Sequence, residues 1–255
     1  MFEAMLNGRI DTGGMRFEPV FADIEELNRV ALGGRAAICK VSCAVLPEIV
    51  KGYRVLDSGS ALGRGNGPLL VCRRGDRERI AGGKGLKVAV PGMRTTARLL
   101  LGRFFPALGD PTPVLFSEVA PRVAHGEFDA GVLIHEGRFT YREHGLEVVA
   151  DLGAEWEKES AGPLPLGCIV ASGELPAEIR KKIGAILRES IRYALDNPQE
   201  SMPFVLAHAQ EMSPEVVKSH IALFVNEYSL SLGPEGRRAM SQLTRLDENT
   251  LFGNY

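Results

Sequence analysis

The chain has 255 residues, 45% of them hydrophobic and 24% charged, with a formal net charge of −2 at pH 7. These values are typical of a globular protein with a substantial core, and they give no electrostatic reason to expect nucleic acid or an anionic membrane as a partner. The sequence has no apolar run of about 18 residues, as a membrane span needs, and its start lacks the features of a signal peptide. We therefore predict a cytoplasmic protein without a membrane or nucleic-acid partner.

Strands and helices alternate along the first part of the chain. Apolar spacing distinguishes the two, and Asp23 followed by two glutamates is a helix-capping signal. The predicted elements are a helix over 1–6, a strand over 15–21, a helix over 23–32, a strand over 37–42, a helical segment over 43–50 and a strand over 69–72.

The charged, glycine-rich stretch 73–85 has little apolar periodicity, so we predict a loop there that crosses to a second lobe. The alternation continues beyond it and predicts βαβ units with mixed, mostly parallel sheets. The predicted strands cover 87–90, 113–116, 130–134 and 145–152, the helices cover 97–105 and 117–125, and a strand over 164–172 returns to the first lobe.

The chain after 172 is predicted to be helical. One helix covers 175–195, Ser213 caps a further helix, and the last helices reach about 246. His208 and His220 lie in this region, too far apart to share one helical face as metal ligands. We interpret both as partly buried structural histidines.

His135 directly follows the predicted buried strand 130–134. In open α/β sheets ligands lie beyond the carboxyl ends of the strands, and histidine can exchange a proton near neutral pH. A purely structural, hydrogen-bonded histidine is the alternative, and this segment alone does not decide between the two.

Three other stretches end strands in polar residues or glycine. The first contains Lys40, Val41 and Ser42, where Lys40 could act as a base or a charge partner and Ser42 as a hydrogen-bond donor. The second is the predicted helix start at 95–97, where backbone N–H groups and hydroxyls could receive a carboxylate. The third is the glycine-rich loop 58–68, in which Arg64 could meet a carboxylate or simply be solvated.

Several kinds of site are disfavoured. The glycine-rich loop lacks the phosphate-binding pattern G-x-x-x-x-G-K-[ST], and a strand follows it where the dinucleotide-binding motif requires a helix. No serine lies in the G-x-S-x-G motif of hydrolases. The four cysteines, Cys39, Cys43, Cys72 and Cys168, are scattered, which suits a reducing compartment and makes a metal site improbable. We therefore expect acid–base chemistry with no metal and no cofactor.

A series of short motifs then follows one another along nearly the whole chain. They begin at Asn7 (NGRIDT), Asp23 (DIEELN), Lys40 (KVS), Ser58 (SGSALGRGNGPL), Val90 (VPGMRTTA), Gly131 (GVLIHEGRFTY), Asp151 (DLGAEWE) and Pro163 (PLPLG). Together they closely resemble the 1,4-dihydroxy-6-naphthoate synthases of the futalosine route to menaquinone. The run from Ile134 to Tyr141 is the most specific part.

This resemblance implies an α/β, two-lobed fold like that of type II periplasmic binding proteins, with a helical C-terminal region. We expect a larger lobe of residues 1–85 plus 164–255, a smaller lobe of residues 86–163, and a ligand cleft between them. The expected activity is that of a carbon–carbon lyase that converts cyclic dehypoxanthinylfutalosine, a small-molecule carboxylate, to 1,4-dihydroxy-6-naphthoate. The sequence leaves the oligomeric state open, with a homodimer as one option.

The resemblance also implies roles for individual residues. His135 matches the proton acceptor of the family, and substrate contacts are implied for Lys40, Val41, Ser42, Thr96 and Ala97. We extend the second group to Thr95. We expect neutral His135 to remove a proton and start carbon–carbon cleavage, while aromatisation provides the driving force.

The chain departs from this family at its start. Members begin with a strand and a Ser-Pro-Cys-Pro-Asn-Asp-Thr loop, whereas this sequence starts within the helix that follows them. We expect a longer native form that contains this loop, the alternative being the loss of part of the site. Chorismate dehydratase of the same pathway and a non-catalytic cytoplasmic binder are the competing functions.

Overall fold

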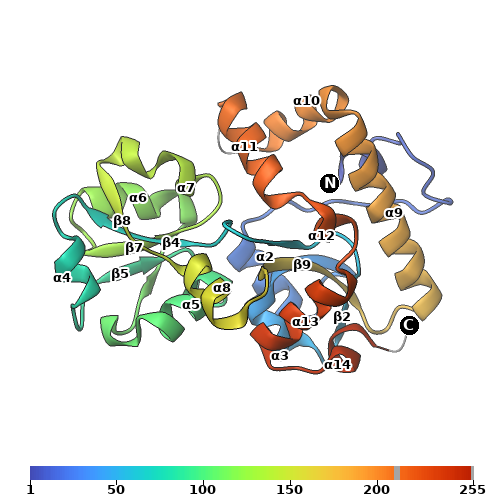
Figure 1. The fold of residues 1–255 in the computed structure, drawn as a ribbon. Coiled ribbons are helices and arrows are strands. Elements are labelled where there is room, and N and C mark those ends of the chain that lie inside the picture. Colours follow the sequence, from blue (N-terminus) through green and yellow to red (C-terminus); the bar gives the residue numbers. More distant parts are fainter. Residues whose placement is uncertain (210–212, 254–255) are drawn as a thin grey trace.

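The computed structural model describes residues 1–209 and 213–253. Each of two lobes is built on its own β-sheet, and the chain runs from the first lobe to the second and back (Figure 1). Within the described residues, no helix is long and apolar enough to cross a membrane.

The sheet of the first lobe is organised around its longest strand, β9, which lies between β1 and β2 and also pairs with β3. All three pairs are antiparallel, and Val41 lies opposite Cys168 in the β1–β9 register. The strands are β1 (Ile38–Ser42), β2 (Tyr53–Val55), β3 (Ala61–Gly63) and β9 (Leu164–Ser172).

The sheet of the second lobe has the order β6-β5-β7-β4-β8. Its β5 pairs in parallel with β6 and β7, whereas β4 pairs antiparallel with β7 and β8. The strands are β4 (Leu69–Arg73), β5 (Val88–Val90), β6 (Thr112–Pro113), β7 (Ala130–Leu133) and β8 (Leu146–Asp151).

Helices cover the sheets of both lobes and close their cores. The helices up to the return strand are α1 (Glu3–Leu6), α2 (Ile24–Leu32), α3 (Leu46–Ile49), α4 (Arg77–Ala81), α5 (Thr96–Phe104), α6 (Phe116–Ala124), α7 (Gly137–Thr140) and α8 (Leu152–Ser160). Helix α2 begins as predicted, because the Asp23 carboxylate accepts hydrogen bonds from the backbone N–H groups of Glu25 and Glu26.

The C-terminal helices pack back on the first lobe, and α10 and α11 lie near the start of the chain (Figure 1). Helix α9 packs on α1, where the Met5 N–H donates to Ser190 Oγ. The helices are α9 (Ala177–Asp196), α10 (Pro198–His208), α11 (Pro214–Phe224), α12 (Glu227–Leu230), α13 (Gly233–Thr244) and α14 (Glu248–Phe252).

The sheets are mixed, as predicted, but in the described residues only the two pairs of β5 are parallel. The prediction of mostly parallel pairing assumed that successive strands pair with each other. Here β1, β2 and β3 all pair with the returning strand β9, and β4 enters the second sheet between β7 and β8. Both of these strands run opposite to their neighbours.

The crossover between the lobes lies earlier than predicted. Strand β4 already belongs to the second sheet, so the chain crosses between β3 and β4 and not in the stretch 73–85. That stretch instead contains α4, whose Ile80 is fully buried. Only one apolar side chain of this short helix packs into the core, so the sequence of this stretch has no helical periodicity.

Two predicted strands are wrong or shortened. Residues 15–21 form no strand, and both Val20 and Phe21 are exposed because no sheet edge lies beside them. The predicted strand over 113–116 is only β6, since α6 already begins at Phe116.

Candidate functional site

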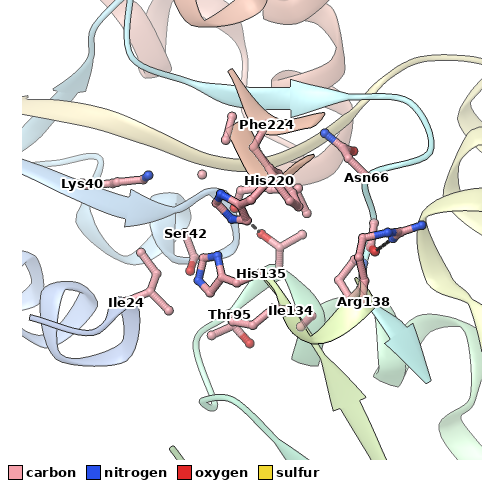
Figure 2. A pocket seen from close by; sticks show the side chains of 17 residues that line it. Ile24, Lys40, Ser42, Asn66, Thr95, Ile134, His135, Arg138, His220 and Phe224 are labelled. Atoms are coloured by element: carbon pink, nitrogen blue, oxygen red, sulfur yellow. Dashed lines mark hydrogen bonds between the residues drawn. The ribbon is translucent and has the colours of Figure 1, made fainter. Parts of the chain in front are cut away.

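A cavity of about 110 Å³ lies between the lobes (Figure 2). Its wall combines β1, β9 and α11 of the first lobe with α5 and the end of β7 from the second. Its lining residues include Lys40, Ser42, Asn66, Thr95, Thr96, Ala97, Ile134, His135, Arg138, Leu166, Gly167, His220 and Phe224.

His135 lies just beyond the end of β7, where its side chain points into this cavity (Figure 2). Its backbone has φ of 53°, a left-handed conformation that is uncommon for a residue with a side chain and is often found at functional sites. The Phe116 ring and the imidazole pack edge to face, with 5.2 Å between ring centroids. The imidazole is therefore held by both its backbone and its neighbours.

The environment of His135 keeps its imidazole neutral. Its pKa is lowered from 6.5 to about 3. Burial is the largest cause, and the nearby His220 and Lys40 contribute the rest. A neutral imidazole has a free nitrogen lone pair and can accept a proton. An anion bound in the cavity would raise this pKa towards the range in which a general base is effective.

Lys40 and Ser42 lie on the same face of β1, because side chains alternate along a strand. Burial lowers the pKa of Lys40. None of the ion pairs within 4.0 Å among the described residues includes its ammonium group. A half-buried cation in this position favours a ligand that carries a negative charge.

Asn28 of α2 orients Ser42 from behind the site. The Ser42 N–H donates to Asn28 Oδ1 at 2.9 Å, and Asn28 Nδ2 donates to Ser42 Oγ at 3.2 Å. Asn28 is completely buried. Because the amide occupies the acceptor side of the hydroxyl, the Ser42 proton can be donated into the cavity.

The start of α5 contributes the wall of the cavity from the second lobe. Thr95 caps the helix, since its Oγ1 accepts from the Arg98 N–H at 3.2 Å and donates to the Gly92 carbonyl at 2.9 Å. Thr96 Oγ1 donates to the Leu166 carbonyl of β9 at 2.9 Å, which ties the two lobes together. Both hydroxyl protons are thus used within the protein, and the helix-start N–H groups of Thr96 and Ala97 are the donors that face an anion.

Arg138, in the short helix α7 that follows His135, connects the two segments that join the lobes. Its guanidinium donates to the Gly67 carbonyl, in the connection from β3 to β4, and pairs with Asp151 at 3.1 Å. Asp151 in turn caps α8 on the return connection. The turn that carries His135 is therefore fixed to both connections.

Two predicted contact residues lie outside the cavity. Val41 points to the other face of β1 and is completely buried in the core, as strand alternation requires once Lys40 and Ser42 line the site. Arg64 is half exposed, pairs with Glu235 of α13 at 3.2 Å and donates to the Ala161 carbonyl. These neighbours hold its guanidinium at the surface, so our expectation that it meets a ligand carboxylate is corrected.

The cavity also contains residues that sequence reasoning missed, above all His220 and Asn66. We interpreted His220 as structural, but α11 places it across from His135, with ring centroids 5.8 Å apart. No local pattern predicts this contact, because the two histidines are 85 positions apart along the chain. Asn66 is buried within the glycine-rich loop, where the sequence drew attention to Arg64 instead.

A larger cavity of about 780 Å³ adjoins the first. It lies between the start of the chain and helices α9, α10 and α11, with a mainly apolar wall that includes Phe21, Phe204 and Val217. Lys40, His135 and His220 line both cavities. Within the described residues, no group of three or more His, Cys, Asp or Glu side chains is placed to hold a metal ion.

Comparison with known proteins matches almost the whole chain to one family. The family model described as "Menaquinone biosynthesis" matches residues 1–249. A 1,4-dihydroxy-6-naphthoate synthase from Thermus thermophilus is 43% identical over 95% of this chain and 87% of its own length. The corresponding enzyme from Streptomyces coelicolor is 40% identical over 95% of this chain and 86% of its own length.

Solved structures agree on the fold. Protein AF1704 from Archaeoglobus fulgidus superposes with a TM-score of 0.89 at 32% identity, over 96% of this chain and 90% of that one. The periplasmic aliphatic sulphonate binding protein SsuA from Escherichia coli has a TM-score of 0.67 at 13% identity, over 98% of this chain and 85% of that one. The fold is therefore like that of periplasmic binding proteins, as the sequence predicted.

Proposed function

Because this chain belongs to the menaquinone biosynthesis family and is an enzyme like its named relatives, we propose that it converts cyclic dehypoxanthinylfutalosine to 1,4-dihydroxy-6-naphthoate. Two relatives with 40% and 43% identity are named for this product. The proposal extends that name to a particular substrate, reaction and set of residues.

The pairing of a neutral His135 with a half-buried Lys40 in one cavity is the observation that carries the proposal. The histidine is neutral, so its lone pair can accept a proton once a bound anion raises its pKa, and the lysine lacks an acidic partner in the described residues. Such a site suits a substrate that is an anion and also a carbon acid. A carboxylate that contains an acidic C–H bond fits both requirements.

The proposed reaction starts when His135 removes a proton from the substrate. The C–H electron pair forms a double bond of the new ring, the electron pair of the broken carbon–carbon bond leaves with the sugar-derived fragment, and the ring becomes aromatic as that fragment departs. The proton stays on the imidazole until it is returned to a product or to water. A positioned general base typically contributes a factor of about 10² to 10⁴ in rate, and aromatisation supplies the driving force.

The substrate carboxylate is proposed to lie among the polar groups that face the cavity. Lys40 offers a charge, Ser42 a hydroxyl proton, and Thr96 and Ala97 the N–H groups of the helix start. Thr95 acts on this site as the helix cap that orders those N–H groups. The bound carboxylate would also supply the negative charge that raises the pKa of His135.

A turnover assay on the purified chain tests this proposal. With cyclic dehypoxanthinylfutalosine as substrate, chromatography with mass detection should show 1,4-dihydroxy-6-naphthoate formed in proportion to enzyme and time. A thermal shift with that substrate but no product would indicate a non-catalytic binder instead. Consumption of chorismate, with the cyclic substrate unchanged, would indicate the dehydratase of the same pathway.

A further inference from the structure

His220 brings a second imidazole to the site from the C-terminal helical region. Figure 2 shows its ring beside that of His135, facing the same cavity from α11. Its Nε2 is buried and has no hydrogen-bond partner in the described part of the chain. A buried polar atom without a partner is unfavourable, so this nitrogen points to a partner that the protein itself does not provide.

The position of His220 also marks where the two cavities meet. The smaller cavity measures about 110 Å³, less than the roughly 300 Å³ at which sites for small organic ligands usually begin. A ligand held there by its carboxylate must extend past Lys40, His135 and His220, which line both spaces, into the cavity of about 780 Å³. The middle of the ligand then lies against the two histidines.

The charge state of His220 defines what it can do at this junction. Burial and the Lys40 ammonium lower its pKa from 6.5 to about 4, so its imidazole is neutral near pH 7. A neutral imidazole that carries its hydrogen on Nε2 is a hydrogen-bond donor that brings no positive charge next to Lys40. A donor of this kind stabilises an oxygen atom that becomes negative during a reaction.

On the basis of the function proposed above, we propose that His220 is a second catalytic residue, which donates a hydrogen bond from Nε2 to a substrate oxygen that becomes enolate-like. When His135 takes a proton from the carbon next to a ring carbonyl, the C–H electron pair forms the new C=C bond and the carbonyl π pair moves to oxygen. His220 stabilises that oxygen without giving up its proton. The same oxygen becomes a hydroxyl of the aromatic product when it is later protonated.

Steady-state kinetics on His220→Phe and His220→Gln test this proposal. Phenylalanine keeps a ring but removes the donor, so kcat should fall by about 10² to 10³ with little change in KM. Glutamine offers an amide N–H at a similar reach and should recover at least part of that loss. His125→Phe, at an exposed histidine that ends α6 and lines neither cavity, is the control and should match the unchanged enzyme.

A further variant keeps the test valid if phenylalanine disturbs folding. His220→Ala should be slow, and added imidazole should raise its kcat, which a packing role for the side chain would not produce. An unchanged kcat in His220→Phe, or equal losses in the phenylalanine and glutamine variants without imidazole rescue, would contradict the role of His220. Absence of naphthoate from the unsubstituted enzyme would instead contradict the proposed function itself.

Discussion

Two neutral histidines beside a half-buried lysine make the stability of the folded protein depend on pH. The pKa values of His135 and His220 fall from 6.5 to about 3 and about 4, mainly because burial disfavours their charged forms. Below pH 6.5 the unfolded chain binds protons at these positions that the folded chain does not. Folding stability at these sites is therefore complete above pH 6.5 and decreases as the pH falls.

This linkage predicts the effect of pH on unfolding. Each histidine contributes a slope of up to about 1.4 kcal/mol per pH unit between pH 6.5 and its folded pKa. In urea unfolding, His135→Asn should lose less stability from pH 6.5 to pH 4 than the unsubstituted protein loses. His125→Asn, at an exposed position, is the control and should keep the original slope. An unchanged slope for His135→Asn would contradict the burial of this imidazole as a neutral group.

Among the individual site residues, the sequence predicted those whose position follows from the nearest strand or helix end. His135 follows a short apolar strand, and Thr95 occupies a capping position, so both could be found locally. His220 could not, because only the packing of α11 brings it to the cavity. Arg64 shows the opposite case, since a distant partner, Glu235, holds it away from the site.

The elements that join the lobes pass each other with almost no space between them. A Cβ atom on Gly67 would lie 2.3 Å from the Gly153 Cα, and one on Gly153 would lie 2.7 Å from the Gly67 Cα. Arg138 binds the Gly67 carbonyl at the same place. Glycine is therefore required at both positions so that the connection after β3 can approach the start of α8.

Two glycine substitutions inside helices should have opposite effects. Gly153→Ala in α8 places its Cβ against backbone, and overpacking of this kind typically destabilises by about 1–3 kcal/mol. Gly184→Ala in α9 meets nothing within 4 Å and should stabilise by about 0.5–1 kcal/mol through helix propensity. Urea midpoints of the two variants give the comparison. Stabilisation by both would contradict the close approach of Gly67 and Gly153.

Strands and helices with strong local signals were predicted well, and pairing between distant strands was not. The strand over 164–172 and the Asp23-capped helix agree with β9 and α2. The run over 15–21 has strand-like alternation, but only a neighbouring strand could have made it part of a sheet. Helix α4 has one buried apolar side chain, too few to give a periodic signal.

The two lobes together form a site that neither lobe contains alone. Lys40, Ser42 and His220 come from the first lobe, and Thr95, Thr96 and His135 from the second. Thr96 bonds across to β9. Local patterns predicted the α/β class and two lobes but placed the crossover too late along the chain. The resemblance of the sequence to a family of two-lobed enzymes added the ligand cleft between the lobes.

Ligand binding should therefore stabilise the molecule as a whole. A ligand that contacts both lobes binds only the folded state, and it adds about 2.7 kcal/mol of stability at a concentration 100 times its Kd. Such a thermal shift is a measure of binding that does not depend on turnover. It separates loss of chemistry from loss of the site.

The most direct measurement compares turnover and binding of cyclic dehypoxanthinylfutalosine in the unsubstituted enzyme and in His135→Asn. Asparagine keeps a polar side chain but cannot accept the proton as a base near pH 7. Naphthoate formation should fall by a factor of about 10² or more, while the thermal shift with substrate persists. Near-normal turnover in His135→Asn would contradict the account, because the proton would then be removed by another group.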